Sequence, residues 1–143
     1  DSLAWQHVRN YRLTGSLPTL GNLALQYENV GPKVQGNPLR LYQPSIMLFD
    51  VWDIDKREYL GMADMIGIAK VLDIPTVEVF NSGMSYPNFS NEELQTIANR
   101  FYLPGVPAEG IVIRPQTPMW VDNRGHRERL SFKVINLNYK ERE

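Results

Sequence analysis

The chain has 143 residues, enough for one domain of ordinary size, and an apolar fraction of 43% that can build a core. It has no cysteine, which excludes a disulfide framework and a thiolate metal site, and no apolar run long enough to span a membrane. The net charge of −1 gives no basic footprint overall, although local patches can still bind nucleic acid. We expect an intracellular protein, and the first residue, Asp1 rather than methionine, suggests a fragment.

The first half of the chain predicts strands that follow a short helical segment. Residues 3–13 are compatible with a short helix. Residues 23–28 and 46–52 are rich in β-forming side chains and predict strands, and residues 58–60 return after a turn as a hairpin partner. A helix is predicted over residues 62–72 because apolar side chains recur on one helical face: Met62, Met65, Ile66, Ala69 and Leu72.

The third quarter of the chain predicts one strand and one helix. Residues 77–80 have the composition of a short strand. Ser90 is followed three residues later by Glu93, the spacing of a capping box, which predicts that a second helix begins there. The apolar pattern carries this helix to Phe101, and the following Pro-Gly pair ends it.

The last quarter predicts two strands, over residues 109–114 and 130–135, with a hairpin turn at residues 122–125 between them. Together with the earlier elements, this pattern predicts an α+β fold of antiparallel strands packed with two helices. We expect residues 1–143 to belong to one domain.

Two charged residues lie at or in the last two predicted strands. Glu109 stands before a glycine and can be either an exposed strand-end glutamate or an oxygen ligand for Mg²⁺ near a phosphate. Gly110 would allow close approach of backbone or ligand. Lys133 lies in an apolar strand, where it can either point to solvent or face inward and contact a phosphate.

Three features of the first half are compatible with nucleotide binding. Phe49 can be a core residue or a surface on which a purine stacks. Glu28 ends a strand before a glycine-bearing loop, where its carboxylate can accept ribose hydroxyls or simply be solvated. Lys33 begins a K-x-x-G string, a pattern common by chance.

Other catalytic motifs are absent or weak. The two histidines, His7 and His126, do not form a pair at zinc-binding spacing, and the chain has no P-loop and no G-x-S-x-G string. His126 lies among Arg124, Arg127 and Arg129, which form either a solvated basic hairpin or a contact to polynucleotide phosphates.

Four segments, taken in their order and spacing, resemble the covalent nucleotidyltransferase superfamily, and above all the RNA ligase family in its Deinococcus-type branch. Residues 25–37 are similar to motif III, Phe49-Asp50 to motif IIIa, residues 109–115 to motif IV, and residues 130–136 with Tyr139 to motif V. The resemblance implies the back part of an adenylyltransferase (ATP-grasp-like nucleotidyltransferase) domain.

The resemblance also implies an ATP-dependent reaction that joins RNA 5′-phosphate and 3′-hydroxyl ends through lysyl-AMP and RNA-adenylate. It implies that Glu28 contacts the ribose, that Phe49 stacks on adenine, that Glu109 binds Mg²⁺ or Mn²⁺, and that Lys133 contacts the nucleotide phosphate. ATP and RNA ends are the expected partners, with no membrane.

The chain departs from the family pattern in three places. No K-x-D-G string, which would hold the nucleophilic lysine, precedes Glu28; Tyr27 stands where a glycine is common; and Ile135 stands where a second lysine is frequent. We therefore expect a segment without the nucleophile that is inactive by itself. A catalytically inactive nucleotide- or RNA-binding module, a DNA ligase-like enzyme and a capping-type enzyme are the alternatives.

Overall fold

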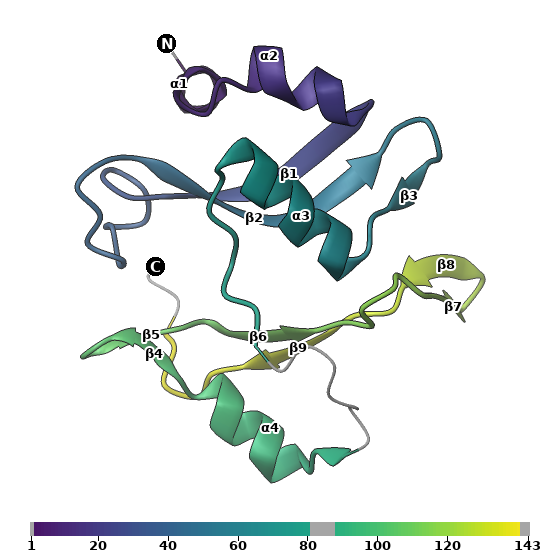
Figure 1. The fold of residues 1–143 in the computed structure, drawn as a ribbon. Coiled ribbons are helices and arrows are strands. Elements are labelled where there is room, and N and C mark those ends of the chain that lie inside the picture. The colour runs from purple at the N-terminus through teal and green to yellow at the C-terminus, as the bar shows by residue number, and fades with distance from the viewer. Residues whose placement is uncertain (1, 81–87, 141–143) are drawn as a thin grey trace. The chain divides into compact units, whose positions relative to one another are not determined.

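The computed structural model of the chain describes residues 2–80 and 88–140, which form two compact units, Asp1–Phe80 and Asn81–Glu143. We call these the N-terminal unit and the C-terminal unit. Their helices and small antiparallel sheets confirm the expected α+β class (Figure 1). The N-terminal unit contains α1 (Leu3–Asn10), α2 (Leu13–Ser16), the 3-10 helix η1 (Leu17–Leu20), β1 (Leu23–Val30), β2 (Ser45–Asp53), β3 (Glu58–Tyr59) and α3 (Met62–Leu72). The C-terminal unit contains α4 (Asn91–Ala98), β4 (Phe101–Leu103), β5 (Val106–Pro107), β6 (Gly110–Ile113), β7 (Trp120–Asn123), β8 (His126–Arg129) and β9 (Phe132–Ile135).

The sheet of the N-terminal unit has the antiparallel order β1-β2-β3. The pairing of β1 with β2 shifts by one residue in the middle of the strands: Gln26 lies opposite Asp50, whereas Tyr27 lies opposite Leu48. Phe49 therefore has no partner on β1 and forms a β-bulge. The strands expected over residues 23–28 and 46–52 and the hairpin partner after them are confirmed, although β1 is two residues longer than expected.

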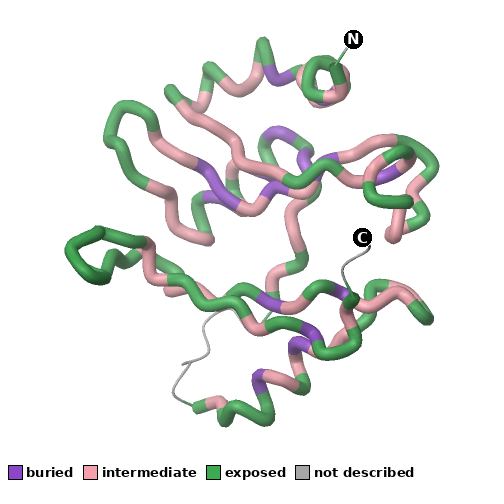
Figure 2. The backbone as a smooth tube through the Cα atoms, turned by 180° about the vertical axis from the view of Figure 1, so that it is seen from behind, coloured by how far each residue is buried: buried purple, intermediate pink, exposed green. Residues whose placement is uncertain are grey.

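One face of this sheet forms the core of the N-terminal unit. Ile46, Leu48 and Val51 of β2 are fully buried and pack with residues of α3, and the buried residues gather along these two elements (Figure 2). The predicted apolar face of α3 is confirmed, since Met65, Ala69 and Leu72 are buried, and Met62 and Ile66 pack against the same cluster.

Helix α1 is attached to the same face of the sheet through polar side chains. His7 is 1% exposed, and its Nε2 atom lies 3.1 Å from Oδ1 of Asn29 on β1. The hydroxyls of Tyr11 and Ser45 lie 3.0 Å apart. These contacts hold α1 in place. A short helix within residues 3–13 was expected, and α1 confirms it.

The strand predicted over residues 77–80 is not present. The chain runs beside β2 through a single parallel bridge, Leu48 with Thr76, and two backbone hydrogen bonds, from Leu48 N–H to Pro75 O and from Val77 N–H to Leu48 O. Pro75 lacks an N–H group, so the pairing cannot extend on that side. The prediction was wrong because a strand also needs a neighbouring strand to pair with along its length, and strand-like composition does not provide that pairing.

Helix α4 begins with the capping box expected from the sequence. The Ser90 hydroxyl accepts a hydrogen bond from Glu93 N–H, and the Glu93 carboxylate accepts one from Ser90 N–H. The helix ends at Ala98, and the expectation that it continues to Phe101 was wrong. Phe101 instead begins β4, which pairs with β5 across a turn that contains Gly105.

The other four strands of the C-terminal unit form two antiparallel two-stranded sheets that follow one another along the chain, and we call the two sheets together the ribbon. β6 pairs with β9, β7 pairs with β8, and Leu130 N–H donates to Met119 O between the two pairs (Figure 1). The turn at the tip has two residues, Arg124 and Gly125, both with positive φ, as a type I′ turn requires. The hairpin turn predicted at residues 122–125 is confirmed. Among the described residues, no helix has both the length and the apolarity needed to cross a membrane.

Candidate functional site

The sheet face opposite the core of the N-terminal unit carries two of the expected site residues. Residues paired across antiparallel strands lie on the same face. Glu28 is paired with Met47, a neighbour of the core residues Ile46 and Leu48, so Glu28 points away from the core. Glu28 is exposed at the end of β1.

The bulge in β2 places Phe49 on this second face as well. Leu48 and Val51 both belong to the core cluster, so the two residues between them lie on the opposite side. Phe49 is half-buried there, and Asp50 is only 4% exposed. Strict alternation would have placed one of the two in the core. The bulge thus gives the second face an aromatic ring and a carboxylate in succession.

An aromatic pair that the sequence analysis did not identify continues this face towards β3. Trp52 lies opposite Tyr59, and their rings meet edge to face with centroids 4.8 Å apart. Gln26 Nε2 donates to the Tyr59 hydroxyl at 3.4 Å. We call Glu28, Phe49, Trp52 and Tyr59 the aromatic face. It combines ring surfaces with one exposed carboxylate, a combination that suits a base and its sugar.

The loop after β1 contains the K-x-x-G string. Lys33 is exposed and has a φ of 68°. A Cβ atom at Gly31 would lie 2.7 Å from Gln43 O, so the two ends of the loop pass very close to each other there. Asn37 closes the loop, because its side chain donates to Leu41 O and accepts from Leu41 N–H.

The other two expected site residues form an ion pair in the C-terminal unit. Lys133 Nζ donates to Oε1 of Glu109, although 24 residues separate them in sequence. Both side chains are 49% exposed. Lys133 therefore points to solvent rather than into the core, and the pair offers a cation and a carboxylate side by side.

Gly110 allows Glu109 to reach Lys133. Its φ is 153°, and a Cβ atom there would lie 2.1 Å from Val134 O on β9. The close backbone approach expected for this glycine is confirmed. Lys133 lies opposite Val112 in the pairing of β6 with β9, so the two side chains lie on the same face of this sheet. By regular alternation, Glu109 would lie on the other face. The unusual backbone at Gly110 interrupts the regular alternation and turns Glu109 towards the face of Lys133.

A buried asparagine holds the ends of β6 and β9 together. Asn136 is 0% exposed. Its amide donates to Arg100 O at 2.8 Å and to Ala108 O at 2.7 Å, and its Oδ1 accepts from Asn138 N–H at 2.8 Å. Its own N–H donates to Glu109 O. Asn136 thus fixes the backbone on both sides of the Glu109–Lys133 pair, a role the sequence analysis did not assign.

The metal ligand set is incomplete in the described part of the chain. No group of three or more histidines, aspartates or glutamates converges among these residues. Glu109 can supply one oxygen, and Mg²⁺ commonly takes one or two carboxylates with water and substrate phosphates. The residues present therefore fit a metal that is held jointly with a phosphate ligand.

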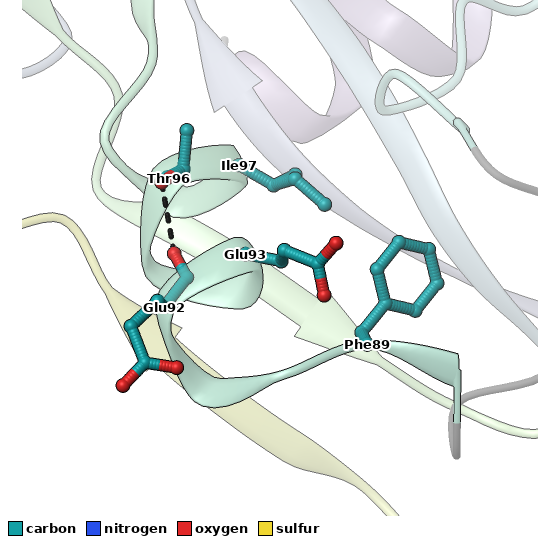
Figure 3. A pocket seen from close by; sticks show the side chains of 5 residues that line it. All are labelled: Phe89, Glu92, Glu93, Thr96 and Ile97. Carbon is teal, nitrogen blue, oxygen red and sulfur yellow. Dashed lines mark hydrogen bonds between the residues drawn. The ribbon is translucent and has the colours of Figure 1, made fainter.

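A shallow depression of about 330 Å³ lies beside α4 (Figure 3), and neither Glu109 nor Lys133 lines it. It is lined by Phe89, Glu92, Glu93, Thr96 and Ile97. Glu93 is already engaged in the capping box, and Thr96 donates to Glu92 O. These polar groups serve the helix itself, so the depression shows no group arranged for a ligand.

Comparison with known proteins identifies the family. The sequence profile of the RNA ligase family matches residues 1–135. The chain belongs to the RNA ligase family. This confirms the family resemblance found in the motifs, while the Deinococcus-type branch stays a prediction. A comparison with curated protein sequences finds no match.

Solved structures of an RNA ligase from Naegleria gruberi resemble the chain in fold. The ligase with pyrophosphate (PPi) has a TM-score of 0.72 and 29% sequence identity, over 92% of this chain and 38% of that one. A lysine-to-alanine variant with ATP and Mn has a TM-score of 0.73, with the same identity and coverage. The α+β fold is thus that of an RNA ligase nucleotidyltransferase domain, and the chain spans 38% of the length of these ligase chains.

Proposed function

We propose that the chain supplies the ATP-binding part of an ATP-dependent RNA ligase, in the back part of its nucleotidyltransferase domain. The observation that carries the proposal is the family match combined with the Glu109–Lys133 pair. A cation next to a metal-binding carboxylate is what a polyphosphate bound with a divalent ion needs. The Naegleria ligase, which is similar over 92% of this chain, has been solved with ATP and Mn.

The aromatic face binds the adenosine. Phe49 provides a half-buried ring on which adenine stacks, and the bulge holds that ring on the face opposite the core. Glu28 is exposed on the same face and accepts hydrogen bonds from ribose hydroxyls. The Trp52–Tyr59 pair supports this surface from the β3 side.

Glu109 and Lys133 bind the phosphates and the metal. With ATP bound, the Lys133 ammonium group would contact a phosphate oxygen in place of the carboxylate, and Glu109 would hold Mg²⁺ or Mn²⁺. The metal ion would supply charge neutralisation at the phosphate, as the ammonium group does, which is the usual basis of phosphoryl-transfer catalysis. The exposed position of the pair makes this exchange possible without unfolding.

The nucleophile of the proposed reaction is not among the five lysines of this chain, because none of them begins a K-x-D-G string. The chain therefore binds ATP without forming lysyl-AMP. In the ligase reaction, AMP passes from the lysine to an RNA 5′-phosphate and leaves when a 3′-hydroxyl attacks. RNA ends are the proposed second substrate, and we propose an intracellular location because ATP and RNA are found there.

Equilibrium dialysis with radiolabelled ATP and Mn²⁺, followed by a denaturing gel, tests the proposal. We expect metal-dependent retention of ATP and no labelled band on the gel. A stable labelled band would show that a lysine of this chain is the nucleophile. No retention of ATP would overturn the proposal.

The same experiment separates the alternatives. An inactive nucleotide-binding module would also retain ATP, and the absence of K-x-D-G is the observation that favours it. Supplying a K-x-D-G segment in trans, from the N-terminal part of an RNA ligase, distinguishes the two. Restored lysyl-AMP formation supports the enzyme, and its absence despite binding of both parts supports the module. The match to the RNA ligase family over residues 1–135 argues against a DNA ligase-like or capping-type enzyme.

A further inference from the structure

The β7–β8 hairpin is exposed along nearly its whole length. All four residues of β7 and three of the four residues of β8 are exposed, including Trp120 at 37%. Elsewhere in the same ribbon, Ile111 of β6 is buried. An isolated two-stranded hairpin is only marginally stable in water. The β7–β8 hairpin, which extends beyond the partly buried β6–β9 strands and exposes an indole ring, is a candidate contact surface.

The strand register collects aromatic and cationic side chains on one face of the hairpin. Trp120 lies opposite Arg129, and Asp122 lies opposite Arg127, so these four side chains share a face. The Arg127 guanidinium carbon lies 5.5 Å from the centre of the Trp120 ring. This cation–π contact restricts the side chains of both residues. They would therefore lose little conformational entropy when a ligand binds to them.

The two acidic residues of the hairpin are bound by neutral donors. Asp122 accepts a hydrogen bond from Gly125 N–H at 3.1 Å, within the turn. Glu128 lies on the other face and accepts from the Asn123 amide at 3.1 Å. The hairpin, residues 120–129, contains three arginines and two carboxylates and so has a net charge of +1, whereas the whole chain has a net charge of −1. The hairpin tip is therefore a local positive patch on a nearly neutral protein.

We propose that this face of the hairpin binds the single-stranded RNA substrate next to its reacting end. Arginines bind phosphates bidentately, and an exposed indole stacks on an unpaired base, so the pair of features suits an unstructured polynucleotide. The proposal rests on the proposed function for the identity of the strand. Its geometry is independent, because β8 leads into β9 through only Leu130 and Ser131, so that Arg129 lies within about 13 Å of Lys133 even if the chain between them is fully extended.

RNA binding by a hairpin variant that lacks the three arginines tests this proposal. The variant combines Arg124→Asn, Arg127→Gln and Arg129→Gln; asparagine at position 124 suits the φ of 52° there, and Asn-Gly is a favoured type I′ turn. The control variant combines Lys56→Gln, Arg57→Asn and Lys70→Gln, which removes three exposed charges from the N-terminal unit. Fluorescence anisotropy with a 5′-phosphorylated single-stranded RNA, at several salt concentrations, gives the affinities.

We expect the hairpin variant to lose about tenfold to 100-fold in RNA affinity at 0.1 M salt, and its slope of log Kd against log salt to fall by about 2, since each lost phosphate contact lowers it by about 0.7. The control variant should keep the affinity of the original chain to within about threefold. Trp120→Ala should weaken binding by about fivefold or more with an unchanged salt slope, because stacking is not electrostatic.

Three outcomes overturn the proposal: an original chain that does not bind RNA, a hairpin variant with unchanged affinity, or a control variant that loses as much. Retention of ATP, measured on the same samples, reports on the proposed function separately. If the hairpin mediated self-association instead, the hairpin variant would differ from the original chain in oligomeric state, measured by sedimentation, but not in RNA affinity.

Discussion

The carboxylate of Glu109 and the ammonium group of Lys133 form an ion pair across the ends of β6 and β9. Both groups are about half exposed, and neither is required to fill the core. The backbone beneath them is fixed by two specific residues, Gly110 and Asn136. The pair thus consists of two exposed side chains on a backbone frame that Gly110 and Asn136 fix. We expect substitutions of the two side chains and substitutions of the two frame residues to have different effects on stability.

Replacing either charged residue should leave the fold almost unchanged. Glu109→Ala and Lys133→Ala should each change the free energy of unfolding by less than about 1 kcal/mol, because exposed ion pairs contribute little. Urea denaturation followed by circular dichroism measures the change. Lys56→Ala, which removes the ion pair of an exposed lysine with Asp53 at 3.6 Å, is the control. A loss several times larger in Glu109→Ala than in the control would mean that the pair is structural.

Replacing the glycine beneath the pair should be costly. Gly110→Ala would place a Cβ atom 2.1 Å from Val134 O and force alanine to a φ of 153°, so we expect at least about 2 kcal/mol of destabilisation. Gly67→Ala is the control, since it lies within α3 and a Cβ there meets nothing within 4 Å. It should stabilise the protein by about 0.5–1 kcal/mol. Equal thermal stability of the two variants would disprove this account of Gly110.

Removing the buried amide should loosen the C-terminal unit. Asn136→Ala removes the side-chain donor to Ala108 O and one of the two donors to Arg100 O, which also accepts from Ala108 N–H, and we expect a loss of at least about 2 kcal/mol. Asn123→Ala removes an exposed amide contact to Glu128 and should cost less than about 0.5 kcal/mol. Hydrogen exchange of the β6 and β9 amides gives a local measurement. Unchanged protection in Asn136→Ala would contradict the proposed frame.

The stability of the N-terminal unit should depend on pH through His7. Burial lowers the pKa of His7 below its ordinary value of 6.5, and the hydrogen bond with Asn29 opposes this only in part. Below pH 6.5 the unfolded chain therefore takes up a proton at His7 more readily than the folded chain does, and the free energy of unfolding decreases. The His7→Gln variant should show a smaller decrease between about pH 7 and pH 5.

A second titration can be kept apart from that of His7. The backbone N–H of Ser90 lowers the pKa of Glu93 from its ordinary value of 4.5, so this carboxylate contributes stability that is lost only as the pH falls below 4.5. If the pH dependence between pH 7 and pH 5 were identical in His7→Gln and the original chain, the assignment to His7 would be wrong.

Local sequence signals predicted those elements that local interactions stabilise. The capping box at Ser90 and the apolar face of α3 depend on residues three or four apart, and both were found as expected. The turn at Arg124–Gly125 follows from two residues. Where non-local pairing decides, the prediction failed: the segment after Thr76 has strand composition but only one bridge to β2, and the residues after Ala98 pair with β5 instead of extending α4.

The site shows the same division. The motif resemblance named Glu28, Phe49, Glu109 and Lys133, but the contacts that position them depend on partners distant in sequence. The bulge at Phe49 arises from the register of β1, and Asn136 acts through carbonyls 36 and 28 residues away. A polar residue directly after an apolar strand was the available signal for Asn136. The predicted hairpin of residues 46–52 and 58–60 brings Trp52 and Tyr59 near each other, but the register that makes them direct partners was not predicted.

The central claim is that the aromatic face and the Glu109–Lys133 pair bind ATP with a divalent metal. The most direct measurement is the ATP affinity of the original chain, Phe49→Ala, Glu109→Ala and Lys56→Ala by titration calorimetry in Mn²⁺. We predict that Phe49→Ala weakens binding by about tenfold, as expected for loss of base stacking. Glu109→Ala should weaken binding in Mn²⁺ but not in its absence, and Lys56→Ala should bind as the original chain does. Affinities in Phe49→Ala and Glu109→Ala equal to that of the original chain would contradict the account.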